Sequence, residues 1–167
     1  SKEEFIKEAR EMKKLAAQYQ IPFVINDNIK VALEVDADGV HIGQDDMSVE
    51  EARKLLGEDK IIGVSAHNVK EALKAQKGGA DYLGVGAVCA TSTKKDANVV
   101  SKEEIKKIKE AVDIPIVAIG GIKKDNIDAL TGTGIDGVAV VSAIFGAKDI
   151  TKDTKELLKT VKKMKQK

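Results

Sequence analysis

Short apolar runs and longer amphipathic segments alternate along this chain. The short runs are rich in Val and Ile and predict strands at 22–26, 39–42, 61–65, 82–86, 115–119 and 137–141. Segments of helical period lie between them, for example at 69–76 and 102–112. Two further helices are expected before the first strand, at about 2–19, and after the last strand, at about 152–164. Strands that alternate with helices predict a parallel sheet covered by helices.

The boundaries of these segments carry repeated signals. Four predicted helices begin with a capping residue three positions before a Glu, at Ser1, Ser48, Asn68 and Ser101. Three predicted strands are entered through an Asp, at Asp38, Asp81 and Asp136. Repeated βα units would produce such a recurrence, and common turn chemistry used several times would produce it too.

Two architectures are compatible with this order of elements, a doubly wound open sheet and a (β/α) barrel. Six strands and seven or eight helices are predicted in 167 residues. A complete eight-stranded barrel needs at least about 200 residues, so this chain is short of one. We expect a single domain over residues 1–167.

Composition excludes several classes of protein. The net charge is +1, only 3% of residues are aromatic and Trp is absent, so neither a basic field nor a stacking platform for nucleic acid is expected. A single cysteine, Cys89, excludes an internal disulfide framework and a Cys-rich zinc site. The sequence shows neither a signal peptide nor a long apolar run, so we expect a cytoplasmic protein without a membrane partner.

Polar or Gly-rich residues follow the carboxyl end of each predicted strand. Asp27 and Asp46 offer the hard oxygen ligands that Mg²⁺ prefers. The run from Thr91 to Lys95 offers three hydroxyls and two ammonium groups, which suit phosphate oxygens, although a solvated turn has the same composition. Gly120 and Gly121 allow the backbone to approach a ligand closely. We expect His41 and Cys89 to be structural, and His67 is a weaker candidate for ligand contact.

Several of these segments occur together and in a fixed order. They are Val-Ile-Asn-Asp, Asp-Gly-Val-His-Ile-Gly-Gln-Asp-Asp, Gly-Val-Ser-Ala-His, Thr-Ser-Thr-Lys-Lys-Asp, Ala-Ile-Gly-Gly-Ile and Val-Val-Ser-Ala-Ile. Taken together, they resemble the thiamine phosphate synthase family of (β/α)8-barrel enzymes over nearly the whole chain. The resemblance implies an α/β fold of the (β/α)8 TIM-barrel type, here a partial barrel with about six parallel strands.

The resemblance also implies a reaction and the residues that perform it. Family members join hydroxymethylpyrimidine diphosphate to hydroxyethylthiazole phosphate and release pyrophosphate with the help of Mg²⁺. By this resemblance Asp27 and Asp46 are the Mg²⁺ ligands, and Lys94 and Ser65 are catalytic. The substrate-binding residues that it implies are Asn26, Ser65, Thr91, Ser92, Thr93, Lys94, Gly121, Val141 and Ser142.

The sequence departs from the family pattern in two respects. Cys89 and Ala90 stand before Thr91, where the family usually has a bulkier residue and a proline. The second departure bears on activity. A Gln-x-Arg-x-Lys segment, which binds the pyrimidine diphosphate in the family, has no counterpart in these residues, and the two strands that open the family's barrel are not found. We therefore expect impaired activity of this chain alone and self-association through exposed strand edges. Two alternatives remain, a thiazole tautomerase or regulatory paralogue and a non-catalytic partial barrel.

Overall fold

All six predicted strands are present in the structure, a computed structural model that describes residues 1–89 and 99–165. The strands are β1 (Val24–Asn26), β2 (Gly39–Ile42), β3 (Ile61–Ala66), β4 (Tyr82–Val85), β5 (Ile116–Ile119) and β6 (Gly137–Ala139). The helices are α1 (Lys2–Gln18), α2 (Ile29–Glu34), α3 (Val49–Leu56), α4 (Val69–Gly78), α5 (Lys102–Ala111), the 3₁₀ helix η2 (Ile127–Leu130), α6 (Ser142–Phe145) and α7 (Ile150–Lys165). Strands and helices therefore alternate as the pattern predicts.

The predicted helix caps are also present. The side chains of Ser1 and Ser48 accept hydrogen bonds from the backbone N–H three residues on, and the Glu at that position bonds back, so both form complete capping boxes. Asn68 and Ser101 accept the equivalent bonds from Glu71 and Glu104. Each cap satisfies a backbone donor that the first helical turn leaves free.

The chain divides into two compact units. Unit 1 consists of residues 1–65 and 75–82, and unit 2 consists of residues 66–74 and 83–167. In unit 1, β2 pairs in parallel with both β1 and β3. In unit 2, β5 pairs in parallel with both β4 and β6. The predicted single domain over residues 1–167 stays a prediction.

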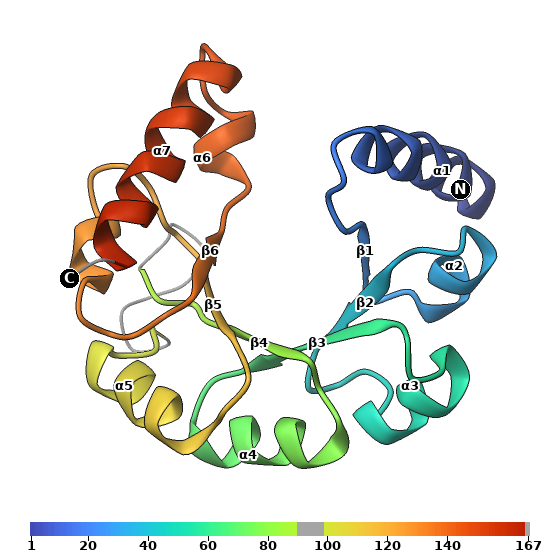
Figure 1. Cartoon of the computed structure of the whole chain (residues 1–167), viewed down its shortest axis with the longest axis horizontal. Coiled ribbons are helices and arrows are strands. Elements are labelled where there is room, and N and C mark those ends of the chain that lie inside the picture. Colours follow the sequence, from blue (N-terminus) through green and yellow to red (C-terminus); the bar gives the residue numbers. More distant parts are fainter. Residues whose placement is uncertain (90–98, 166–167) are drawn as a thin grey trace. The chain divides into compact units, whose positions relative to one another are not determined.

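The two faces of the strands in unit 1 differ in chemistry. Figure 1 shows α1, α2 and α3 along one face of β1, β2 and β3. The row Ile25, Val40 and Ile62 is almost completely buried, and these three residues are aligned by the strand register. In the next row, Asn26, His41 and Gly63, the side chains of Asn26 and His41 lie on the opposite face because side chains alternate along a strand. One face therefore forms an apolar core, and the other carries polar groups.

The Asp residues that enter strands share one structural role. Each accepts a hydrogen bond from a backbone N–H of the neighbouring strand or the residue before it, at 2.6 to 2.9 Å. The three pairs are Asp38 with Phe23, Asp81 with Ile62 and Asp136 with Ile116. A cation from a preceding helix binds two of these carboxylates, Arg53 at Asp81 (2.7 Å) and Lys109 at Asp136 (2.9 Å). The recurring Asp in the sequence therefore fixes one strand against the next.

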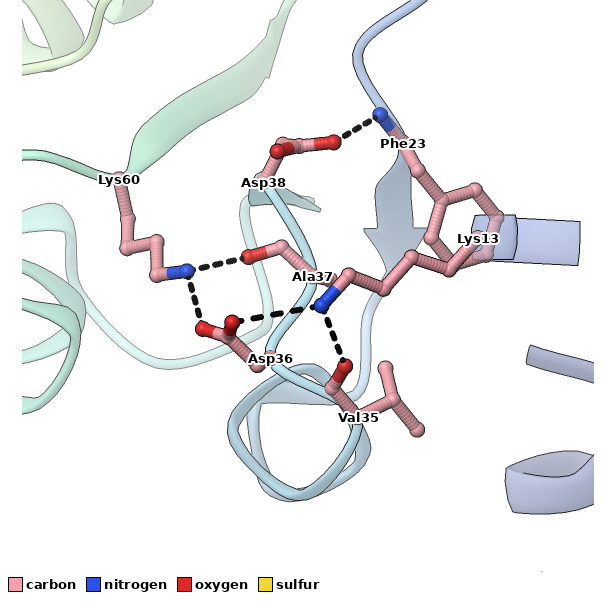
Figure 2. A network of polar contacts seen from close by, with 7 residues as sticks. All are labelled: Lys13, Phe23, Val35, Asp36, Ala37, Asp38 and Lys60. Atoms are coloured by element: carbon pink, nitrogen blue, oxygen red, sulfur yellow. Dashed lines mark hydrogen bonds and ion pairs between the residues drawn. The ribbon is translucent and has the colours of Figure 1, made fainter. Parts of the chain in front are cut away.

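A polar network connects α1 with the entries to β2 and β3 in unit 1. Figure 2 shows Lys13 and Lys60 on either side of Asp36, with N–O distances of 3.3 and 2.6 Å. The same two ammonium groups donate to the backbone carbonyls of Val35 and Ala37. The hydrogen bond from Lys60, followed by that from Lys13, holds the pKa of Asp36 below its usual value. The carboxylate is exposed, so the main consequence is the geometry of this turn.

Asp136 makes the stability of the protein depend on pH. Partial burial would raise the pKa of Asp136, but the hydrogen bond from the Ile116 N–H and the charge of Lys109 together hold the pKa below its ordinary value of 3.8. A lowered pKa in the folded state means that the stabilisation is fully present above the unfolded pKa. We expect it to be lost as the pH falls below about 4 and through the folded pKa.

Urea unfolding between about pH 2 and pH 6 measures this effect. The difference in unfolding free energy between wild type and Asp136→Asn should shrink on acidification, because Asn keeps the hydrogen-bond acceptor and loses the charge. Asp59→Asn, at an exposed carboxylate, is the matched control. A pH-independent difference for Asp136→Asn would contradict the prediction.

In the described part of the chain, no helix is long and apolar enough to cross a membrane.

Candidate functional site

The predicted site residues fall into three groups in the structure. Asn26, Asp27, Asp46 and Ser65 lie in unit 1, at or just after the carboxyl ends of β1, β2 and β3. Gly121, Val141 and Ser142 lie in unit 2, after β5 and β6. Thr91, Ser92, Thr93 and Lys94 lie outside the described residues.

Two carboxylates lie close together in unit 1. The side chains of Asp27 and Asp46 are within hydrogen-bonding reach of each other, and burial together with the charge of Asp46 raises the pKa of Asp27. The Asn26 amide donates to Asp27 Oδ2 (2.8 Å), and the Gly43 N–H donates to Asp46 Oδ2 (2.7 Å). Asp27 has a positive φ of 62°, which turns the chain sharply at the end of β1. The local backbone therefore holds like charges together.

The carboxylate pair fits a Mg²⁺ ion. Mg²⁺ is commonly held by one or two carboxylates, with water and substrate phosphates as its other ligands. A cation at this position would relieve the repulsion that raises the pKa of Asp27. Within residues 1–89 and 99–165, no group of three or more His, Cys, Asp or Glu side chains could hold a metal. The donor set thus suits an ion that completes its coordination with substrate.

Ser65 is connected to His41 beside this pair. His41 Nε2 lies 2.9 Å from Ser65 Oγ, and His41 Nδ1 lies 2.9 Å from the Tyr82 hydroxyl. The Gln44 amide donates to the Ser65 carbonyl at 2.6 Å. The Asp27 N–H donates to the His41 carbonyl at 2.8 Å, which joins this cluster to the carboxylates. Burial lowers the pKa of His41, which favours the neutral ring.

Sequence reasoning gave no role to Tyr82 and Gln44 and treated His41 as structural only. Gly63 is the sequence signal that could have revealed the role of Tyr82. Gly63 is the register partner of His41, and a Cβ at this position would lie 2.1 Å from the Tyr82 ring. A glycine inside a strand often marks such a close approach. Gln44 had no comparable signal, because its contact depends on a loop.

The loop after β5 lies against residues 87–89 in unit 2. Gly120 has a φ of 98°, and a Cβ there would lie 2.7 Å from Ala87 Cα, so only glycine fits without strain. The Gly120 carbonyl accepts a hydrogen bond from the Cys89 N–H at 3.0 Å. The Gly121 carbonyl accepts a bond from the Asn126 amide at 2.8 Å. Cys89 is half-buried, and burial raises the pKa of its thiol, which agrees with a structural role.

Ser142 borders a pocket of about 400 Å³ in unit 2. Lys123, Lys124 and Asp153 also line this pocket. Lys124 forms ion pairs with Asp153 and Glu156, so part of its charge is neutralised. Val141 precedes Ser142 and is 68% exposed, and its carbonyl accepts hydrogen bonds from the Ile144 and Phe145 N–H groups. The structure thus places Ser142 at the pocket, with Val141 next to it in the chain and Gly121 two residues before Lys123.

His67 contacts a glutamate of unit 2. Its ring Nδ1 and its backbone N–H both contact Glu71 Oε2 at 2.8 Å. Glu71 belongs to the first turn of α4, where Asn68 accepts from its backbone N–H. His67 is therefore part of a helix start in unit 2.

Parallel strands followed by carboxylate, hydroxyl and glycine residues at their carboxyl ends define an enzyme of the TIM-barrel class. A family model described as "Thiamine monophosphate synthase" matches residues 1–144. The chain belongs to this family, and its members' activity makes it a transferase of thiamine biosynthesis.

Relatives and solved structures agree with this assignment. The chain is 52% identical over 157 residues to the thiamine-phosphate synthase of Clostridium tetani, covering 94% of this chain and 75% of that protein. It is 53% identical over 159 residues to the thiamine-phosphate synthase of Methanobrevibacter smithii, covering 95% of this chain and 76% of that protein.

A thiamine phosphate pyrophosphorylase from Pyrococcus furiosus superposes with a TM-score of 0.90 and 44% identity, over 98% of this chain and 79% of the other. This likeness confirms the predicted fold class, an α/β fold of TIM-barrel type with six parallel strands. The chain spans about three quarters of the length of these relatives.

Proposed function

We propose that this chain binds the substrates of thiamine phosphate synthase and that different residues bind different parts of them. In unit 1, Asp27 and Asp46 hold Mg²⁺, and Asn26 and Ser65 contact the pyrimidine diphosphate. In unit 2, Gly121, Val141 and Ser142 bind the thiazole phosphate. Thr91, Ser92, Thr93 and Lys94 complete the phosphate contacts, with Lys94 and Ser65 as catalytic residues.

The observation that carries this proposal is the pairing of Asp27 with Asp46 beside Ser65. Burial and the charge of Asp46 raise the pKa of Asp27, and a divalent cation held by the two carboxylates would neutralise their repulsion. Asp27 and Asp46 would hold Mg²⁺ there, and the bound ion would supply positive charge to stabilise a departing diphosphate. A thiazole tautomerase has no diphosphate to release, so the pair favours the synthase over that alternative.

The residues of this chain have separate tasks in the reaction. The Asn26 amide, already bonded to Asp27, orients that carboxylate. Ser65 presents a hydroxyl beside the carboxylate pair, where it can donate to a phosphate oxygen. The glycines after β5 leave backbone groups accessible for the second phosphate. Electrostatic stabilisation of the departing diphosphate is the main contribution that these groups make.

Activity of residues 1–167 alone is expected to be impaired. These residues contain no Gln-x-Arg-x-Lys segment, and losing one electrostatic stabiliser costs about 10²-fold or more in turnover. A pyrophosphate-release assay with both substrates measures this, with the Clostridium tetani relative as the reference. We expect turnover about 10²-fold below the reference, and a further loss for Ser65→Ala. Turnover equal to the reference would contradict the impairment, and no thiamine phosphate at any enzyme concentration would contradict the function.

Self-association is a second part of the proposal. All three residues of β6 are half-exposed, and Ile119, Val141 and Phe145 near its end are 40 to 74% exposed. Strands with accessible edges and apolar faces recruit partners. We expect light scattering to show a mass that rises with protein concentration, and Val138→Lys should reduce it.

Leu158→Lys, at an exposed position on α7, is the matched control for Val138→Lys. A monomer at every concentration, or equal effects of the two lysines, would contradict association through β6.

A further inference from the structure

Tyr82, His41 and Ser65 form a continuous line of hydrogen bonds in unit 1. The Tyr82 hydroxyl lies 2.9 Å from His41 Nδ1, and His41 Nε2 lies 2.9 Å from Ser65 Oγ. The Tyr82 and His41 rings are tilted, with centroids 5.5 Å apart. All three residues are half-buried. The proposed function uses only Ser65, so the other two residues have no assigned role in it.

The fold leaves room for the Tyr82 ring in this line of hydrogen bonds. His41 on β2 stands opposite Gly63 on β3, and the Tyr82 ring occupies the volume that a side chain at position 63 would fill. A Cβ at Gly63 would lie 2.1 to 2.4 Å from three atoms of Tyr82. Replacing Gly63 with any other residue would therefore displace the phenol from His41. The contact is a consequence of strand register and one glycine.

The direction of the hydrogen bonds follows from counting donors. A neutral imidazole has one N–H donor and one acceptor nitrogen, so the line can run in only two directions. In one, Tyr82 donates to Nδ1 and the Nε2–H donates to Ser65. In the other, Ser65 donates to Nε2, the Nδ1–H donates to Tyr82, and the phenol proton needs a further acceptor.

The chemistry of the two hydroxyls favours the first direction. A phenol O–H is a stronger hydrogen-bond donor than the aliphatic O–H of a serine, because a phenol ionises far more readily. The Tyr82 hydroxyl, 2.9 Å from His41 Nδ1, is therefore the better donor to the one acceptor nitrogen of a neutral imidazole. Burial raises the pKa of Tyr82, so this group keeps its proton. The first direction also leaves the Ser65 proton free.

We propose that Tyr82 and His41 are positioning residues that make Ser65 an obligate hydrogen-bond donor toward a phosphate oxygen of the substrate. With the Nε2–H donating to its oxygen, the Ser65 hydroxyl has its own proton available for a ligand. A donor fixed in this way needs no reorientation when negative charge develops on the departing diphosphate. The inference rests on the proposed function, in which Ser65 contacts the diphosphate.

The first experiment reads the direction of the line without any ligand. The chain has two histidines, so ¹H–¹⁵N long-range correlation spectra of residues 1–167 contain two rings, and His67→Asn identifies the signals of His41. We expect His41 as the neutral Nε2–H tautomer in wild type and as a mixture of tautomers in Tyr82→Phe. The Nδ1–H tautomer in wild type would overturn the inference.

The second experiment connects the line to ligand binding. Calorimetry with pyrophosphate and Mg²⁺ should show about tenfold weaker binding for Ser65→Ala, the scale of one lost charge-assisted hydrogen bond. Tyr82→Phe should lose several-fold, and Tyr82→Phe/Ser65→Ala should be no weaker than Ser65→Ala alone, because the line acts only through Ser65. His41→Gln, whose amide can donate to Ser65, should bind more tightly than His41→Leu.

The outcomes separate this inference from the proposed function. Weaker binding in Ser65→Ala with unchanged binding in Tyr82→Phe and His41→Leu overturns the positioning role and leaves the function intact. Unchanged binding in Ser65→Ala contradicts the contact on which the proposed function depends. Additive losses in the double variant would show a general structural effect and overturn the inference. Thermal unfolding of each variant verifies that the affinities belong to folded protein.

Discussion

Asp27→Asn/Asp46→Asn is expected to abolish the gain in pyrophosphate affinity that Mg²⁺ gives the wild-type chain. The two carboxylates lie together, and the charge of Asp46 helps to raise the pKa of Asp27. Without Mg²⁺ they repel an anionic ligand, and with Mg²⁺ they hold the ion that attracts it. In EDTA, the double variant should therefore bind pyrophosphate at least as tightly as wild type does. In Mg²⁺, it should bind pyrophosphate more weakly than wild type, by about tenfold or more.

Isothermal calorimetry in EDTA and in Mg²⁺ measures the difference in pyrophosphate affinity between the double variant and wild type, which should change sign between the two buffers. Asp45→Asn is the control, because it removes an exposed neighbouring carboxylate with the same charge. A general loss of negative charge would affect Asp45→Asn and the double variant alike. An equal Mg²⁺-dependent gain in wild type and the double variant would contradict the two-carboxylate site.

Lys94→Ala is expected to lower turnover by about 10²-fold or more when it is introduced into a complete, active protein of this family. Lys94 follows three hydroxyl residues in the sequence, and in the proposed function its ammonium meets the departing diphosphate. An ammonium placed there stabilises charge that exists mainly in the transition state, so kcat should fall more than KM rises.

Lys95→Ala is the matched control, because it removes the same charge one residue further along the loop. It should have a much smaller effect on kcat. Rapid-quench measurement of thiamine phosphate formation separates the chemical step from product release. Equal kcat values for wild type and Lys94→Ala would refute the catalytic role of this lysine.

Elements of this fold that depend on local chemistry could be predicted from the sequence. Alternating apolar runs and capping residues predicted the six strands and the helix starts at Ser1, Ser48, Asn68 and Ser101, and the structure confirms them. Caps and strand propensity act over a few residues, so the sequence itself contains the information. The resemblance to thiamine phosphate synthase, confirmed by the family match, likewise depended on short segments in order.

Contacts between segments distant in the sequence were decided only by tertiary structure. The Asp at each strand entry was visible as a repeat, but its bond to the preceding strand's backbone, as at Asp81 and Ile62, follows from strand order. The contact of His41 with Tyr82 spans 41 residues and exists because register places Gly63 between them. Sequence spacing fixes which side chains follow a strand, whereas register and packing fix which of them meet. The sequence alone therefore determined the family and the groups available for chemistry. The tertiary structure determined that Ser65 has hydrogen-bond partners.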